Sequence, residues 1–263
     1  MDIILIIIIT IITLYLLNIN KFEHFVNNNS TAIVYQTHFL SNILKQNILS
    51  MINDIDNNYD FWLLYDNTKL DFDYKWVNEN NIKYYLYNKQ DCLKHYTEKV
   101  YKPYSGIYNS PAKPIIPIFN LKYNYNYIWC IEYDVIYKGN WIDIFNYYNN
   151  DRSEVISYIN DKAQSYSWNN WTNCNICTLE NRLQIFLPVI RYSRYILDKI
   201  YTHLRKGYTG HHEAFIGTVC NIYSKCKLTE LNPKFIGVYK YRPIIKYDEL
   251  DNLPNNKLYH PVK

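Results

Sequence analysis

Two acidic residues, Glu132 and Asp134, stand two positions apart at the end of an apolar run that begins at Tyr127. The run is rich in Ile, Trp and Tyr and is short for a helix, so it predicts a buried β-strand. Because side chains alternate along a strand, both acids project from one face while Tyr133 points to the other. Burying two carboxylates is costly unless a cation meets them, and a divalent metal that carries a phosphate would do so. The spacing therefore points to nucleotide-dependent chemistry.

Acidic residues also follow other strand-like runs. Asp66 follows the apolar run Phe61–Tyr65, and Asp161 follows a run predicted as a strand over Glu154–Ile159. In open α/β sheets, ligands bind beyond the carboxyl ends of the strands. The repetition strengthens the hypothesis of a ligand site at one edge of a sheet more than any single acid does.

The elements that must position these acids alternate between strands and helices over one domain length. Strands are predicted at residues 31–38, 61–65, 83–87, 154–159 and in the run from Tyr127, and helices at 39–55, 141–148, 191–204 and about 212–223. Prolines 103, 111, 114 and 117 mark an irregular segment, and residues 165–177 are expected to form a loop. This alternation predicts an open α/β sheet.

The length and composition fit a globular protein with one sizeable α/β domain, or at most two small ones. The chain has 263 residues, of which 48% are hydrophobic and 20% are charged. Its 30 Tyr residues reflect a compositional bias, which weakens any argument from a single Tyr. The net charge of +4 comes from basic residues scattered along the chain, so no nucleic-acid partner is expected.

The first residues form a strongly apolar segment. Ile3–Leu17 is almost unbroken aliphatic sequence, which Ile19 extends to a short transmembrane span. A signal peptide would have a basic start and small residues at a cleavage site, whereas this chain carries Asp2 at its start. We therefore expect an uncleaved anchor that contacts the membrane through residues 3–19. The chain is accordingly divided into an anchor (1–20), a linker (21–30) and a folded domain (31–263).

The orientation of this single-pass anchor is left open. Lys21 follows the span and Asp2 precedes it, so the positive-inside rule would leave the large domain in the cytosol. Membrane-anchored enzymes of the secretory pathway commonly have the opposite topology.

Two of the six cysteines form the pattern Cys174-Asn-Ile-Cys177. This is the spacing of half a zinc site or of a redox pair, but no second C-x-x-C or nearby C-x-x-H completes it. Ordinary thiols or one local disulfide are therefore favoured.

The block W-C-I-E-Y-D-V-I-Y-K-G-N-W, residues 129–141, resembles the acidic metal motif of nucleotide-sugar glycosyltransferases with the GT-A fold. Those enzymes usually have Asp-x-Asp where this chain has Glu132-x-Asp134. A glycosyltransferase-like family is similar over a wider set of motifs, which occur in a matching order between Thr31 and the C-terminus. These are F-L-P-V-I-R-Y-S-R (186–194), G-H-H-E-A (210–214) and Y-H-P-V-K (259–263). The resemblance implies a single GT-A-like domain, an open mixed sheet flanked by helices.

The resemblance also implies roles for individual residues. Asp134 and Glu132 would hold Mn²⁺ or Mg²⁺ against the donor diphosphate, and His260 would be a third ligand. Because Glu132 is longer than Asp by one methylene, contact with ribose or binding through water is the alternative for it. Lys263 would reach a phosphate, and Thr37 and Asp66 lie where this fold usually binds the base and ribose. A capped turn for the acids and a solvated tail for the last residues are the structural alternatives.

Glu213, in Gly210-His-His-Glu-Ala214, would be the general base that deprotonates an acceptor hydroxyl. The alternative is a favourable acid in the first turn of a helix. The motif lacks the second His of H-E-x-x-H, which excludes a zinc-protease pattern. Two further expectations concern an acceptor platform of Trp168 and Trp171, with core packing as the alternative, and structural roles for Arg191 and Arg194.

The leading hypothesis is a membrane-anchored, metal-dependent glycosyltransferase of hexosyl or N-acetylhexosaminyl type. It would move a sugar from a nucleotide-diphosphate donor to a hydroxyl of a glycan, protein or lipid. A different metal-dependent nucleotide or phosphate transferase is the first alternative. The second is a glycosyltransferase-like binding module without activity, which the Glu132 variant keeps open.

Overall fold

The computed structural model describes residues 30–97, 112–159, 168, 171 and 174–263. The predicted anchor, nearly all of the linker and the strand-end residue Asp161 lie outside these ranges. Within them, no helix is both long enough and apolar enough to cross a membrane. The anchor and its contact with the membrane stay predictions.

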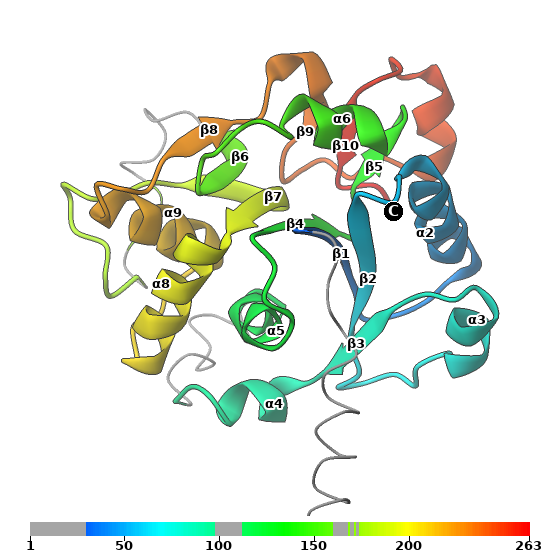
Figure 1. Ribbon diagram of the computed structural model, residues 1–263. Helices are drawn as coiled ribbons and strands as arrows, with labels where there is room; N and C mark the ends of the chain where they lie inside the picture. The colour runs from blue at the N-terminus through cyan, green and yellow to red at the C-terminus, as the bar shows by residue number, and fades with distance from the viewer. Residues whose placement is uncertain (1–29, 98–111, 160–167, 169–170, 172–173) are drawn as a thin grey trace, which may run out of the picture.

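The large domain is built on a seven-stranded mixed sheet with the strand order β3-β2-β1-β4-β7-β6-β8 (Figure 1). Its strands are β1 (Thr31–Thr37), β2 (Tyr59–Asp66), β3 (Tyr84–Tyr87), β4 (Tyr127–Glu132), β6 (Val155–Ile159), β7 (Ile185–Ser193) and β8 (Leu228–Glu230). The first four strands are parallel, whereas β7 is antiparallel to both of its neighbours, β4 and β6. The expected open mixed sheet flanked by helices is therefore present.

Helices cover both faces of this sheet (Figure 1). One face packs against α5 (Ile115–Tyr123), α8 (Arg194–Arg205) and α9 (His212–Ile222), and the other against α2 (Asn42–Asp54) and α6 (Trp141–Tyr147). Alternate residues of β1 enter the two cores: Ala32 and Val34 one, Ile33 and Tyr35 the other. The remaining helices are α3 (Tyr74–Glu79), α4 (Lys89–Leu93) and the 3-10 helices η3 (Pro233–Phe235) and η4 (Tyr247–Asn252).

A second sheet of three strands holds the C-terminal segment against the large sheet. In it, β10 (Leu258–His260) lies between β5 (Ile136–Tyr137) and β9 (Ile236–Tyr239). Because β5 closely follows the turn that contains Asp134, this pairing brings His260 to the acidic pair. Just beyond β10, the amide of Val262 donates a hydrogen bond to the carbonyl oxygen of Asp134 at 2.9 Å.

The helix predicted to start at Arg191 starts later. Arg191 lies in β7, where it pairs with Trp129 of β4 and Ile156 of β6, and α8 begins only at Arg194. Every residue of β7 is buried. A continuously buried strand lacks the alternation of polar and apolar residues that separates strand from helix in a sequence, so the prediction was wrong here.

Both arginines have the structural role that the sequence favoured. The guanidinium group of Arg191 donates to the carbonyl oxygens of Tyr148 and Asp151 at 2.9 Å, and pairs with the Asp151 carboxylate at 3.2 Å. Arg194 donates to the carbonyl oxygen of Tyr125 at 3.2 Å. These bonds satisfy loop carbonyls and the buried charge together.

The proline-rich segment is more regular than expected. Helix α5 starts at Ile115, directly after Pro114, and contains Pro117 in its first turn. Proline fits there because the first N–H groups of a helix have no acceptor within the helix. The other two prolines, Pro103 and Pro111, lie outside the described residues.

The cysteines form two local disulfides, one more than expected. Cys174 is bonded to Cys177, and Cys220 to Cys226. The remaining two cysteines are buried thiols.

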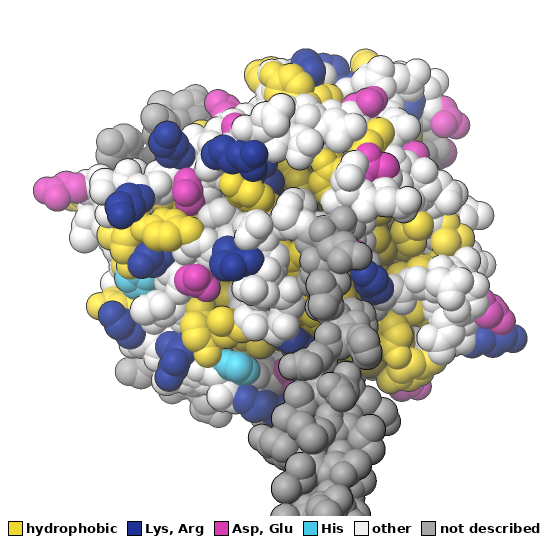
Figure 2. Space-filling view, viewed as in Figure 1, with side chains coloured by type: hydrophobic (Ala, Val, Ile, Leu, Met, Phe, Trp, Pro, Cys, Tyr) yellow, Lys and Arg dark blue, Asp and Glu magenta, His cyan; other side chains and the backbone are white. Residues whose placement is uncertain are grey.

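The charged side chains show no single-sign stripe on the face drawn in Figure 2. Basic side chains are spread over that face, with acidic and hydrophobic ones between them.

Candidate active-site cleft

All seven residues predicted for the site line one cleft with a volume of about 860 Å³. The carboxyl ends of β1, β2 and β4 supply one part of its wall, the start of α9 another, and the C-terminal segment a third. The residues are Thr37, Asp66, Glu132, Asp134, Glu213, His260 and Lys263. Their roles in catalysis or binding stay predictions.

Glu132 and Asp134 reach the cleft by a different local geometry than the sequence suggested. Glu132 is the last residue of β4, but Asp134 lies in the turn that follows, which the amide of Val135 closes by donating to the Glu132 carbonyl at 3.1 Å. The two acids are therefore not on one strand face, yet the turn brings them together. With His260 they form a cluster in which one ligand atom from each lies within 4.8 Å of the others.

The contact between Asp134 and His260 shows what this cluster can hold. Nδ1 of His260 lies 3.1 Å from the carbonyl oxygen of Lys240. Because a carbonyl oxygen only accepts hydrogen bonds, Nδ1 carries a proton and donates it to this oxygen. Nε2 of the same ring lies 3.5 Å from Oδ1 of Asp134. That oxygen is buried and has no hydrogen-bond partner among the described residues. These two atoms can share a proton or a cation, so the residues fit a metal.

Two lysines already pair with the acids. Nζ of Lys113, a buried residue, lies 2.7 Å from Oε1 of Glu132, and Nζ of Lys263 lies 3.2 Å from Oδ2 of Asp134. Burial opposes ionisation of Asp134, but His260 and Lys263 outweigh it and lower the pKa of the carboxyl group. Likewise, Asp134 and Tyr133 outweigh burial and raise the pKa of Lys263. The Asp134–Lys263 pair is therefore charged at neutral pH.

Glu213 is in the first turn of α9 and has an environment unlike that of the other two acids. Burial, reinforced by the charge of Glu132, raises its pKa to about 8, although Gln184 and Lys113 act in the opposite direction. A carboxyl group with a pKa near the working pH is suited to exchange a proton with a substrate. Glu213 is an acid in the first turn of a helix, as the alternative expected, and it also lines the cleft. The two roles are therefore compatible.

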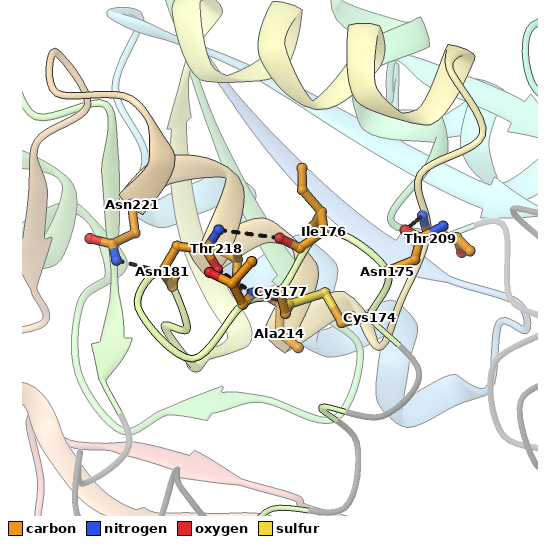
Figure 3. The surroundings of a disulfide bond; sticks show 10 residues. Cys174, Asn175, Ile176, Cys177, Asn181, Thr209, Ala214, Thr218 and Asn221 are labelled. Carbon is orange, nitrogen blue, oxygen red and sulfur yellow. Dashed lines mark hydrogen bonds between the residues drawn. A yellow bond between two sulfur atoms is a disulfide. The ribbon is translucent and has the colours of Figure 1, made fainter.

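The Cys174–Cys177 disulfide lies against the helix that carries Glu213. Figure 3 shows it beside Ala214 and Thr218 of α9, with Sγ of Cys177 at 3.2 Å from Oγ1 of Thr218. The neighbouring Asn175 side chain accepts a hydrogen bond from the amide of Thr209 at 2.8 Å, which ties the disulfide to the turn before α9. The disulfide segment thus supports the start of α9 from two sides.

At the other end of the cleft, Thr37 and Asp66 shape the turns that follow β1 and β2. Oγ1 of Thr37 donates to the carbonyl oxygen of Phe39 at 2.8 Å. Oδ1 of Asp66 accepts a hydrogen bond from the amide of Thr68 at 3.0 Å. Both residues line the cleft.

Sequence reasoning missed Lys113 and Gln36. Lys113 precedes α5 within the proline-rich segment, which was expected to be irregular and carried no motif. It donates to Oε1 of Gln36 at 3.2 Å as well as pairing with Glu132. Gln36 could have been identified from the sequence, because a polar side chain inside a buried strand needs a hydrogen-bond partner. His211 and His212 also line the cleft, and the sequence singled them out only as part of the G-H-H-E-A motif. Burial lowers their pKa values to about 4 and about 3.

The proposed tryptophan platform is not part of the cleft wall. Trp171 is buried in the core. Trp168 packs edge-on against Trp171 and against His211, with ring centroids 5.4 Å and 4.7 Å away. For these two residues the core-packing alternative was correct.

No protein-family model and no curated protein sequence matches the chain. Solved structures that align with it include mouse xyloside xylosyltransferase 1, with 10% identity and a TM-score of 0.46 over 88% of this chain and 97% of that chain. The glycosyltransferase GlyE of Streptococcus pneumoniae TIGR4 aligns with 12% identity and a TM-score of 0.41 over 79% and 46% of the two chains. The WbbM bifunctional glycosyltransferase aligns with 11% identity and a TM-score of 0.46 over 84% and 40%. Values this low assign neither a family nor an activity.

Proposed function

We propose that this protein is a metal-dependent glycosyltransferase with a GT-A-like fold, which uses a nucleotide-diphosphate sugar as donor. The observation that carries the proposal is the contact of Asp134 Oδ1 with His260 Nε2, which lie 3.5 Å apart on two buried side chains in a cleft that also contains Glu213. Polar groups of this kind at the carboxyl ends of strands in an open α/β sheet are where such a fold binds ligands.

Asp134, Glu132 and His260 are the residues that would hold Mn²⁺ or Mg²⁺. Carboxylate oxygens suit both ions, and the imidazole favours Mn²⁺. The ion, when bound, neutralises charge that develops on the leaving diphosphate.

The two lysines are placed to complement the same reaction. When the acids serve as metal ligands, Lys113 and Lys263 lose their carboxylate partners and can pair with phosphate oxygens instead. Each lysine would then be paired with a carboxylate in the empty site and with a phosphate in the occupied one. Such pairing matters because an unpaired charge in a low-dielectric cleft is costly.

Glu213 is proposed as the general base. It takes the proton of an acceptor hydroxyl while the hydroxyl oxygen forms a bond to the anomeric carbon of the donor sugar. The bond between that carbon and the diphosphate oxygen breaks, and the nucleoside diphosphate leaves with the electron pair. Thr37 and Asp66 are proposed to hold the nucleobase and the ribose of the donor nucleotide. The transferred sugar is proposed to be a hexose or an N-acetylhexosamine, and the acceptor a glycan, protein or lipid.

The proposed location is a membrane, with residues 3–19 as a single-pass anchor. The two disulfides favour an oxidising compartment for the catalytic domain, because disulfides are rare in the cytosol. This argument opposes the cytosolic orientation that Lys21 and Asp2 suggest.

A binding module without activity is the second candidate, and one observation favours it. Lys113 pairs with Glu132 and so already supplies a positive charge where a metal-binding motif needs a vacant carboxylate. In that case nucleotide would bind without turnover.

The proposal is tested by hydrolysis of a panel of UDP- and GDP-sugars in the presence of Mn²⁺, together with thermal stabilisation by UDP or GDP. We expect a nucleotide-dependent and Mn²⁺-dependent rise in Tm for the wild type and its loss in Asp134→Ala. Glu79→Ala removes an exposed acid on α3 that does not line the cleft, and should behave as wild type. Stabilisation without hydrolysis would support the binding module, and no response to any nucleotide would reject both candidates.

A further inference from the structure

An exposed aromatic and aliphatic pair borders the cleft. Ten large hydrophobic side chains are exposed among the described residues, and of these only Tyr241 and Ile244 line the cleft. Tyr241 is 60% exposed and Ile244 is 49% exposed. Between them stands Arg242, which also lines the cleft. We call residues 240–245 the rim segment.

The rim segment is hydrogen-bonded at both ends to the C-terminal residues 260–263. At its start, the carbonyl oxygen of Lys240 receives the hydrogen bond from Nδ1 of His260. At its end, the amide of Ile245 donates to the carbonyl oxygen of Pro261 at 2.8 Å, and the amide of Lys263 donates to Ile245 at 2.9 Å. The backbone of the rim segment is therefore held beside His260 and Lys263.

The rim segment shares its cleft with Glu213, because Tyr241, Arg242 and Ile244 line the same cleft as that acid. It follows Tyr239, whose ring packs against Phe186 and His260 with centroid distances of 5.1 Å and 5.9 Å. Thr37 and Asp66, which are proposed to hold the donor, lie at the ends of β1 and β2, whereas the rim segment follows β9.

Arg242 differs from the other cations of this region. Lys113 and Lys263 pair with the acids, whereas Arg242 makes no hydrogen bond or ion pair with the described part of the chain. A guanidinium group has five N–H donors in a planar arrangement, which suits recognition of oxygen atoms at the edge of a ligand.

We propose that Tyr241, Arg242 and Ile244 form the acceptor subsite, and that its ligand is a pyranoside. A pyranose ring has an apolar face of C–H groups and a periphery of hydroxyl groups. Tyr241 and Ile244 pack against the face, while Arg242 donates hydrogen bonds to the hydroxyl groups. The inference rests on the proposed function, because Glu213 is the group that would deprotonate this ligand.

The test compares wild type with Tyr241→Ala and Tyr241→Phe, with 4-nitrophenyl glycosides of xylose, glucose, galactose and N-acetylglucosamine as acceptor probes. We expect Tyr241→Ala to raise the KM for the acceptor by roughly tenfold, the effect of losing one well-packed aromatic contact. Donor hydrolysis without acceptor should keep its kcat and donor KM within about twofold, since Tyr241 would not touch the donor. Tyr241→Phe should retain acceptor binding. Tyr74→Ala, which removes an exposed tyrosine outside the cleft, is the control.

An equal rise in the donor KM would place the rim segment in the donor site and overturn the inference. So would an unchanged acceptor KM. If the wild type hydrolyses no donor, the proposed function fails, and saturation-transfer NMR with the same glycosides still decides the subsite. Contact signals in wild type that disappear in Tyr241→Ala would then uphold it, and their absence in wild type would reject it.

Discussion

Nζ of Lys263 lies 3.2 Å from Oδ2 of Asp134, the carboxylate proposed as the main metal ligand. The last lysine of the chain thus occupies one of the two oxygens that the site would offer to a cation. Metal and lysine compete for Asp134, while lysine and donor phosphate attract each other. Metal and nucleotide are therefore expected to bind better together than separately.

Lys263→Met is predicted to change the two affinities in opposite directions. Without nucleotide, the variant should bind Mn²⁺ severalfold more tightly, because the competing ammonium group is gone. For UDP or GDP in the presence of Mn²⁺, its affinity should fall by roughly tenfold, as expected for a lost charge-assisted contact. Isothermal titration calorimetry measures both constants. Lys75→Met, a change at an exposed lysine outside the cleft, should alter neither, and a parallel loss of both affinities in Lys263→Met would contradict the competition.

The pH dependence of transfer is predicted to report Glu213. Its pKa is raised to about 8, and a general base acts only when deprotonated, so transfer should rise with pH and level off above about 8. Glu213→Gln should lower kcat by about 10²–10⁴-fold and remove this dependence, while Mn²⁺ and nucleotide still bind. Rates of transfer from pH 6 to 9 provide the measurement. Glu180→Gln, at an exposed acid, serves as the control, and an intact pH profile in Glu213→Gln would assign the base elsewhere.

The same carboxyl group is predicted to make folding stability depend on pH. Because the folded pKa of Glu213 is raised above the value in an unfolded chain, its favourable contribution is complete below about pH 4 and is lost as pH rises toward about 8. Over that interval the free energy of unfolding should fall by roughly 2–4 kcal/mol from this residue. Urea unfolding of wild type and Glu213→Gln at several pH values measures the difference, which should shrink to nothing at low pH. A difference that stays constant with pH would rule out titration as its cause.

The Cys174–Cys177 disulfide is predicted to stabilise the start of α9. The double variant Cys174→Ser/Cys177→Ser should lose about 2 kcal/mol, a value typical of a short loop, and should shift the pH profile of transfer because Glu213 is less firmly held. The matched variant Cys220→Ser/Cys226→Ser opens the disulfide at the other end of α9. It should lower stability with little effect on the profile. Denaturant unfolding and pH–rate profiles separate the outcomes, and equal effects of both variants on the profile would show that the support is not local.

Sequence patterns predicted the part of the fold in which local periodicity and burial agree. The strand before Asp66 and the helix from His212 occur where they were expected. The patterns did not separate β7 from α8, because a strand buried on both faces has no alternation to recognise.

The site was predictable to the extent that its residues lie in motifs or at strand ends. Glu132, Asp134 and His260 were assigned to one cluster from their residue types and from a family resemblance. Lys113 and Arg242 belong to no such pattern, and they reach the cleft only through tertiary packing of segments without regular structure. The two-residue strand β5 is likewise too short to leave a sequence signal.

The pairing of β10 with β5 and β9 has a consequence for biosynthesis. The large sheet is complete once β8 has been made, but His260 joins Asp134 only after the last strand has left the ribosome and docked. A nascent chain therefore makes most of its hydrophobic core before the proposed metal site can form. Under the proposed function, a chain without β10 would lack the His260 ligand of the proposed metal site.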